Sequence, residues 1–325
     1  MRRIGAYAAA ALAALLLAAP PAEAFGLRLG PFHIRLPLPL RLHIPHRHLY
    51  MRAGPEEIGR SEGGAALLYP GVGFKTVMQD IFSPADVAPW PFGYREILTA
   101  AFARPAATRA AALCRPADGG DAGLIENLQA AIAPNSDQQR LLQKLGGALG
   151  AANAYLANAC PKTIPGEATA RLALMQSQIE KLTLAVDMIR PPLQDLQRSL
   201  DDEQKARFAV MIEPAADRPA RSECAALPAA DWPIDQIDHS VQPTAAQRTA
   251  LAEVKDALDS AAKDLGDHCP AEPSPTAVAR LETIEARLDA SWRATLSIRV
   301  ALADFETKLS AEQKSRFDTL RLAAR

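Results

Sequence analysis

The chain repeats a long helical segment of itself, with the two copies 109 residues apart. From Leu172 to Leu200, apolar residues follow one another in alternating steps of three and four. This is the heptad spacing of a helix that buries one seam along its length. Apolar residues return at the equivalent places from Leu281 to Leu309. Similar residues close each seam, Leu-Asp-Asp-Glu-Gln-Lys-Ala-Arg-Phe at 200–208 and Leu-Ser-Ala-Glu-Gln-Lys-Ser-Arg-Phe at 309–317. The chain therefore contains a duplicated helical unit.

Each copy of the unit also has shorter helical patterns before its seam. A short apolar pattern ends before Pro134 in the first copy and before Pro243 in the second, and a longer one runs into Cys160-Pro161 or Cys269-Pro270. Proline ends helices because it lacks an amide donor and clashes with the preceding turn. We therefore predict an all-α fold of two tandem four-helix repeats, each with two short helices, one long helix and one short helix. The repeats span 114–212 and 223–325, and 213–222 links them.

The two seams differ at one place. Pro191-Pro192 interrupts the first seam, where the second has Val300-Ala301. Proline inside a helix removes a hydrogen bond. The sequence thus predicts a kink or break in the first long helix and a straighter second one.

Each seam is too long for its own repeat to cover. A helix over 172–200 would be about 43 Å long, which exceeds the length of the two shorter helices beside it. The sister repeat is tethered nearby at high effective concentration, so we expect the repeats to pair as an intramolecular pseudodimer. Independent repeats and a homo-oligomer are the alternatives.

Capping signatures mark the starts of helices in both repeats. A residue that can cap a helix N-terminus precedes a glutamine by three positions, which is the pattern of a capping box. In the first repeat, Asn135 with Gln138 and Ser136 with Gln139 are alternative boxes for the second helix. The remaining pairs are Asp201 with Gln204, Thr244 with Gln247, and Ser310 with Gln313. We assign these residues a structural role.

The part of the chain before the repeats divides into three segments. Residues 1–24 have the basic start, apolar core and small-residue end of a secretory signal peptide, with cleavage expected after Ala24. Residues 25–62 form a basic, Pro- and His-rich arm, expected to be extended and flexible. Its His43, His46 and His48 are weak candidates for a metal site, and a solvated arm is the favoured interpretation. Residues 63–113 are rich in aromatic residues, with short helices expected at about 73–82 and 93–103. Their aromatic residues are expected to pack on the helical body, and an exposed apolar surface that binds a partner is the alternative.

The four cysteines follow the duplication. An exported chain meets an oxidising compartment, where four cysteines allow three pairings. The symmetry of the repeat favours Cys114 with Cys160 and Cys224 with Cys269. Free thiols or a metal site are less favoured because no histidine recurs beside the cysteines.

The glutamine motifs resemble those of a known family. Leu-Ser-Ala-Glu-Gln at 309–313, Leu-Asp-Asp-Glu-Gln at 200–204 and Pro-Thr-Ala-Ala-Gln at 243–247 are similar to the Leu-Thr-x-x-Gln motif of the LTXXQ, or Spy/CpxP-like, family of periplasmic proteins. Asp201 stands where that motif has threonine. The resemblance implies a cradle-shaped helical chaperone that works without ATP, or a stress or metal sensor that acts on a signalling partner.

The sequence carries no recognisable catalytic motif, so we expect no enzyme activity and no cofactor. Asp195 and Asp304 recur but are expected on a solvated face. A net charge of −1 excludes a general nucleic-acid binder. Beyond the signal, nothing is long and apolar enough to span a membrane.

The favoured interpretation is a periplasmic ATP-independent chaperone or holdase whose partners are unfolded or envelope client proteins. Basic side chains steer acidic chains toward such a surface. Candidate client-binding cations are Lys205, Arg207, Lys314 and Arg316. The alternatives are an envelope-stress or metal-responsive sensor with a sensor-kinase partner, and a structural envelope protein.

Overall fold

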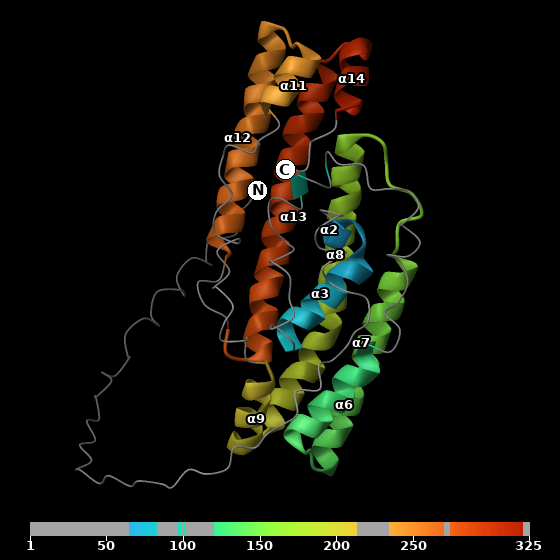
Figure 1. Cartoon of the computed structure of the whole chain (residues 1–325), viewed down its shortest axis with the longest axis vertical. Coiled ribbons are helices and arrows are strands. Elements are labelled where there is room, and N and C mark those ends of the chain that lie inside the picture. Colours follow the sequence, from blue (N-terminus) through green and yellow to red (C-terminus); the bar gives the residue numbers. More distant parts are fainter. Residues whose placement is uncertain are drawn as a thin grey trace, which may run out of the picture. The chain divides into compact units, whose positions relative to one another are not determined.

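The computed structural model describes residues 65–82, 97–98, 101, 120–212, 234–269 and 274–320. Within these ranges the regular structure is entirely α-helical, which confirms the predicted fold class (Figure 1). The predicted signal peptide, the His-rich residues 25–62 and the predicted linker 213–222 lie outside the described residues.

Each repeat contains the four helices that the sequence predicts. The first repeat has α6 (Gly120–Ile132), α7 (Ser136–Asn158), α8 (Ala168–Ser199) and α9 (Asp202–Ile212). The second has α11 (Ile234–Val241), α12 (Ala245–Asp267), α13 (Ala277–Thr307) and α14 (Ala311–Asp318). Of the helices in the described ranges, none has the length and apolar character that a membrane span requires.

The helices pack in the same way within each repeat. The second helix lies along the long helix, and the first packs against the fourth, so α7 contacts α8, α12 contacts α13, α6 contacts α9 and α11 contacts α14. The predicted seams are buried at these contacts. In α8 the buried seam residues are Leu172, Met175, Ile179, Leu182, Val186, Ile189, Leu193 and Leu196.

The two long helices pack against each other. Thr169, near the start of α8, donates from Oγ1 to Glu306 Oε2 near the end of α13 at 3.0 Å. Val278, near the start of α13, donates its amide to Gln197 Oε1 near the end of α8 at 3.3 Å. Thr169 is the repeat equivalent of Val278, and Gln197 is the equivalent of Glu306. The long helices are therefore antiparallel and related by an approximate two-fold axis, as in the isologous interface of a dimer. This confirms the expected pairing of the repeats within one chain.

Of the kink or break expected at Pro191-Pro192, the break is absent, and the kink stays a prediction. α8 runs without interruption from Ala168 to Ser199 and contains both prolines. The carbonyls that lose their amide donors belong to Asp187 and Met188, which are exposed, so water can satisfy these carbonyls. Ile189 and Leu193 on either side are fully buried, and their packing stabilises the helix across the prolines.

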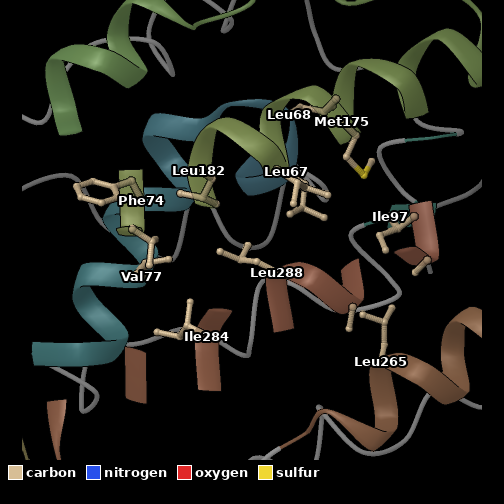
Figure 2. Packing of buried hydrophobic residues seen from close by; sticks show 14 of the residues in the cluster. Leu67, Leu68, Phe74, Val77, Ile97, Met175, Leu182, Leu265, Ile284 and Leu288 are labelled. Atoms are coloured by element: carbon tan, nitrogen blue, oxygen red, sulfur yellow. The ribbon is translucent and has the colours of Figure 1, made fainter. Parts of the chain in front are cut away.

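The aromatic-rich segment supplies part of the core. It forms α2 (Ala65–Leu68) and α3 (Pro70–Phe82), and residues 97–98 and 101 are also helical. α3 contacts both α8 and α13. Figure 2 shows Phe74 and Val77 of α3 grouped with Leu182 of α8 and with Ile284 and Leu288 of α13. Tyr69, Phe74 and Phe82 are buried, so docking on the helical body is correct for these three; Trp90, Phe92, Tyr94 and Phe102 lie outside the described residues.

Candidate functional site

The capping residues lie where the sequence places them. Asn135, Thr244 and Ser310 each accept from the amide three residues on, while that residue's glutamine side chain accepts from the cap amide. Asp201 does the same, since Oδ1 accepts from Gln204 N at 2.8 Å and Asp201 N donates to Gln204 Oε1 at 3.1 Å. Of the two boxes possible before the second helix, the structure forms Asn135 with Gln138.

The glutamines of these boxes also bind one another across the repeat. Gln138 Nε2 donates to Gln204 Oε1 at 2.7 Å, and Gln204 Nε2 donates back to Gln138 Oε1 at 2.9 Å. Gln247 and Gln313 form the same reciprocal pair, with both distances 2.9 Å. All four side chains are buried. We call each pair an amide clamp, because it joins the starts of the second and fourth helices. The capping pattern alone did not predict this pairing.

Two of the proposed client-binding cations have structural contacts beside the clamps. Arg207 donates from Nε to Ala131 O at 3.0 Å and from Nη2 to Ile132 O at 3.1 Å, which are carbonyls at the end of α6. Its equivalent Arg316 donates to Val241 O at the end of α11 at 3.2 Å. Lys205 and Lys314 are exposed. The side chains of Arg207 and Arg316 are 39% exposed, so all four cations reach solvent.

A second pair of equivalent arginines holds the N-terminal segment between the repeats. Arg280 donates to Ser274 O at 2.8 Å and to Ile81 O, near the end of α3, at 3.3 Å. Arg171 donates to Pro165 O at 3.1 Å and from Nε to Ala101 O at 2.9 Å. Both arginines are buried. Each therefore binds the loop before its own long helix and one carbonyl of the segment that contains α3. The repeat aligns these arginines, but their partner carbonyls could not be foreseen.

The remaining candidates are distributed as follows. Cys160 and Cys269 are disulfide-bonded, while Cys114 and Cys224 lie outside the described residues, so the pairing stays a prediction. His43, His46 and His48 also lie outside them. Asp195 pairs with Arg198, and Asp304 with Lys308, on the solvent-exposed surface. In the described part of the chain, no group of three or more histidine, cysteine or acidic side chains has a geometry suited to a metal ion.

A groove lies at one end of the paired long helices. It encloses about 860 Å³ between the end of α8, the start of α13 and α9. Arg198 and Lys205 supply its charge, and apolar side chains such as Phe208 and Val278 supply part of its wall. Phe208 is buried against Phe82 of α3, with ring centroids 6.5 Å apart. The full lining is Gln194, Gln197, Arg198, Lys205, Ala206, Phe208, Ala209, Pro275, Thr276 and Val278.

The equivalent place at the other end of the long helices has the opposite charge. Burial raises the pKa of Glu306 above its ordinary value, although the hydrogen bond from Thr169 lowers it. The nearby carboxylates of Asp318 and Glu167 raise this pKa further, while Lys314 lowers it. These charge interactions place Glu167, Glu306, Asp318 and Lys314 together. We call this cluster the acidic end.

Comparison with protein families matches the chain twice. The model of the LTXXQ motif family covers residues 121–211 and again 229–321, the two structural repeats. The chain belongs to the LTXXQ motif family. It carries the family unit in tandem, and the segment with α2 and α3 precedes both matched ranges. Neither the curated proteins nor the solved structures contain a significant match.

Proposed function

We propose that this LTXXQ protein is an exported, periplasmic chaperone or holdase that binds unfolded proteins on its helical surface without ATP and without catalysis. Membership of the LTXXQ family supports this assignment. The observation that carries it is the antiparallel pairing of the two repeats, which makes a continuous helical surface from two long helices. Such a surface can bind an extended chain by many weak contacts.

The surface offers apolar contacts beside charges. Leu184 and Met188 of α8 are 52% and 41% exposed and lie four residues apart, on one face of the helix. Asp187 and Arg190 form an ion pair beside them, and Arg190 Nε also donates to Glu285 of α13 at 2.7 Å. Exposed charges accelerate encounter with a client, and exposed apolar side chains retain it.

The repeat supplies a matched variant that tests this surface. The second repeat carries Arg293 and Ser297 at the places of Leu184 and Met188. Replacing Leu184→Arg and Met188→Ser therefore gives the first repeat the polar residues that its copy already tolerates on the same helix. Both positions are solvent-exposed, so we expect a change in stability of only about 0.5 kcal/mol.

The assay follows light scattering of a heat-unfolding model enzyme. Wild-type protein should suppress aggregation at near-stoichiometric ratio, and the double variant should suppress it less. Serum albumin at equal mass concentration controls for non-specific crowding. The proposal is wrong if wild-type protein suppresses no more than albumin does. Deleting residues 25–62 in parallel tests the arm: zinc binding lost with that deletion, without any effect on aggregation, would favour a metal-responsive regulator.

A further inference from the structure

The duplication has produced two equivalent end sites with opposite charge. The groove between α8, α9 and α13 presents Arg198 and Lys205, and its lining contains no acidic residue. At the acidic end, different residues occupy the equivalent positions. Glu306 replaces Gln197 of the groove, Glu167 replaces Thr276, and Asp318 replaces Ala209. Equivalent helices surround both ends, so the difference in charge between the two ends comes from their side chains.

The cations of the groove are available to a ligand. Arg198 pairs with Asp195, and Lys205 with Asp202, in contacts three residues apart on the same helix. Asp202 is fully exposed, and the Arg198 side chain is 74% exposed. Exposed ion pairs of this kind contribute little free energy, so a carboxylate arriving in the groove can replace them at small cost.

The groove also has the size and chemistry of a peptide site. Its volume lies within the range of about 300–1,000 Å³ that is usual for ligand sites. Phe208, Val278 and the two alanines give it an apolar wall, and Gln194 and Gln197 offer amide groups that can donate to or accept from a peptide backbone. Charge complementarity selects an acidic ligand.

We propose that this groove binds an extended, unfolded peptide segment in which acidic residues alternate with small apolar residues, and that the acidic end does not. Carboxylates of the peptide contact Arg198 and Lys205, while its apolar side chains lie against Phe208 and Val278. The inference deepens the proposed function, because it names the class of client segment and the place that receives it.

Fluorescence anisotropy of a labelled synthetic peptide that alternates Asp with Leu and Ala tests the site. The full-length mature protein should bind this peptide and should bind the versions with Asn or Lys in place of Asp more weakly. Replacing Arg198→Gln and Lys205→Gln together should weaken binding about tenfold. Lys255→Gln, which removes an exposed lysine of α12 that pairs with Asp259 on the same helix and is not part of the groove lining, should leave the affinity unchanged. Binding should also weaken with added salt, because both cations are exposed.

A gain of function gives the converse test. Changing the acidic end to the residues of the groove, with Glu167→Thr, Glu306→Gln, Thr307→Arg and Asp318→Ala, should raise the stoichiometry from one peptide per chain to two. Equal affinity for the Asp and Asn peptides would overturn the proposal, as would equal weakening by Lys255→Gln. Concentration-dependent self-association that the Arg198/Lys205 variant abolishes would also overturn it, because the occupant would then be a second copy.

The aggregation assay separates the two proposals. If the wild-type protein and the Arg198/Lys205 variant suppress aggregation equally and neither binds the peptide, the groove assignment is wrong and the chaperone function stands. If the groove binds the acidic peptide but the protein does not suppress aggregation, the chaperone function is wrong and the groove assignment stands.

Discussion

The amide clamps should couple the second and fourth helices of each repeat. The Gln204 side chain takes part in four hydrogen bonds: two with Gln138, one from Asp201 N and one to Ile132 O at 3.1 Å. Its replacement by alanine removes all four. Asp201 is exposed, Ile132 O keeps its bond from Arg207, and Gln138 keeps its bonds with Asn135 N and Ser199 O, so every partner retains water or another hydrogen bond. With a net value near 1 kcal/mol for each hydrogen bond, we expect Gln204→Ala to destabilise the protein by about 2–3 kcal/mol.

A double-mutant cycle isolates the clamp itself. Gln138→Ala, Gln204→Ala and the double variant are compared by urea unfolding, followed by circular dichroism at the helical band. Two hydrogen bonds join the two side chains directly, so the coupling free energy should be about 1–2 kcal/mol, and the double variant should lose less than the sum of the singles. Gln139→Ala is the control, because Gln139 is adjacent and exposed. Its effect should stay within about 0.5 kcal/mol.

Additive free energies would refute this reasoning. They would mean that Gln138 and Gln204 act only as separate helix caps and that their contact contributes nothing. The same cycle on Gln247 and Gln313 provides an internal repetition, since that clamp has the same geometry in the second repeat.

Three further predictions follow from other features. Ala133 has φ 46°, in the left-handed region that favours glycine, so Ala133→Gly should raise the unfolding free energy by about 0.5–1 kcal/mol, as measured by urea unfolding. The folded pKa of Glu306 is raised above its ordinary value of 4.5, so its carboxyl stabilises the fold at low pH and this contribution is lost as the pH rises through the folded pKa. Glu306→Gln should therefore be more stable than wild type at about pH 7, with a gap that closes near pH 4, and an equal gap at both pH values would contradict the assignment. Non-reducing peptide mapping should recover Cys114 linked to Cys160 and Cys224 linked to Cys269, whereas a Cys160–Cys224 peptide would refute this pairing.

The helical content and the pairing of the repeats could be predicted because local signals specify them. Heptad spacing marks the seam that each long helix buries, and proline and capping residues mark where helices begin and end. The N-caps of α8 and α13 are Glu167 and Thr276, which are equivalent positions of the two repeats. A seam longer than its own repeat can cover requires a partner, and the tethered copy supplies it.

The features that the sequence did not specify depend on contacts distant in sequence. Pro191-Pro192 would break an isolated helix, but the burial of Ile189 and Leu193 outweighs that local preference. The partners of Arg171 and Arg280 are backbone carbonyls of a segment outside the repeat, and carbonyls leave no sequence signal. Arg207 and Arg316 stay candidate client-binding cations. Their bonds to the carbonyls at the ends of α6 and α11 were not predicted, because the sequence does not show which carbonyls lie beside them.

The packing of α3 against both long helices determines which residues a shortened protein must keep. Ile81 and Ala101 belong to one stretch of chain that is not duplicated. Their backbone carbonyls accept hydrogen bonds from Arg280 and Arg171, which are equivalent residues of the two repeats. A fragment limited to the matched family ranges would lack both carbonyl acceptors. It would also expose to solvent the apolar side chains of α8 and α13 that α3 covers. We therefore expect a fragment limited to the family ranges to be less stable than a protein that keeps the stretch upstream of the repeats.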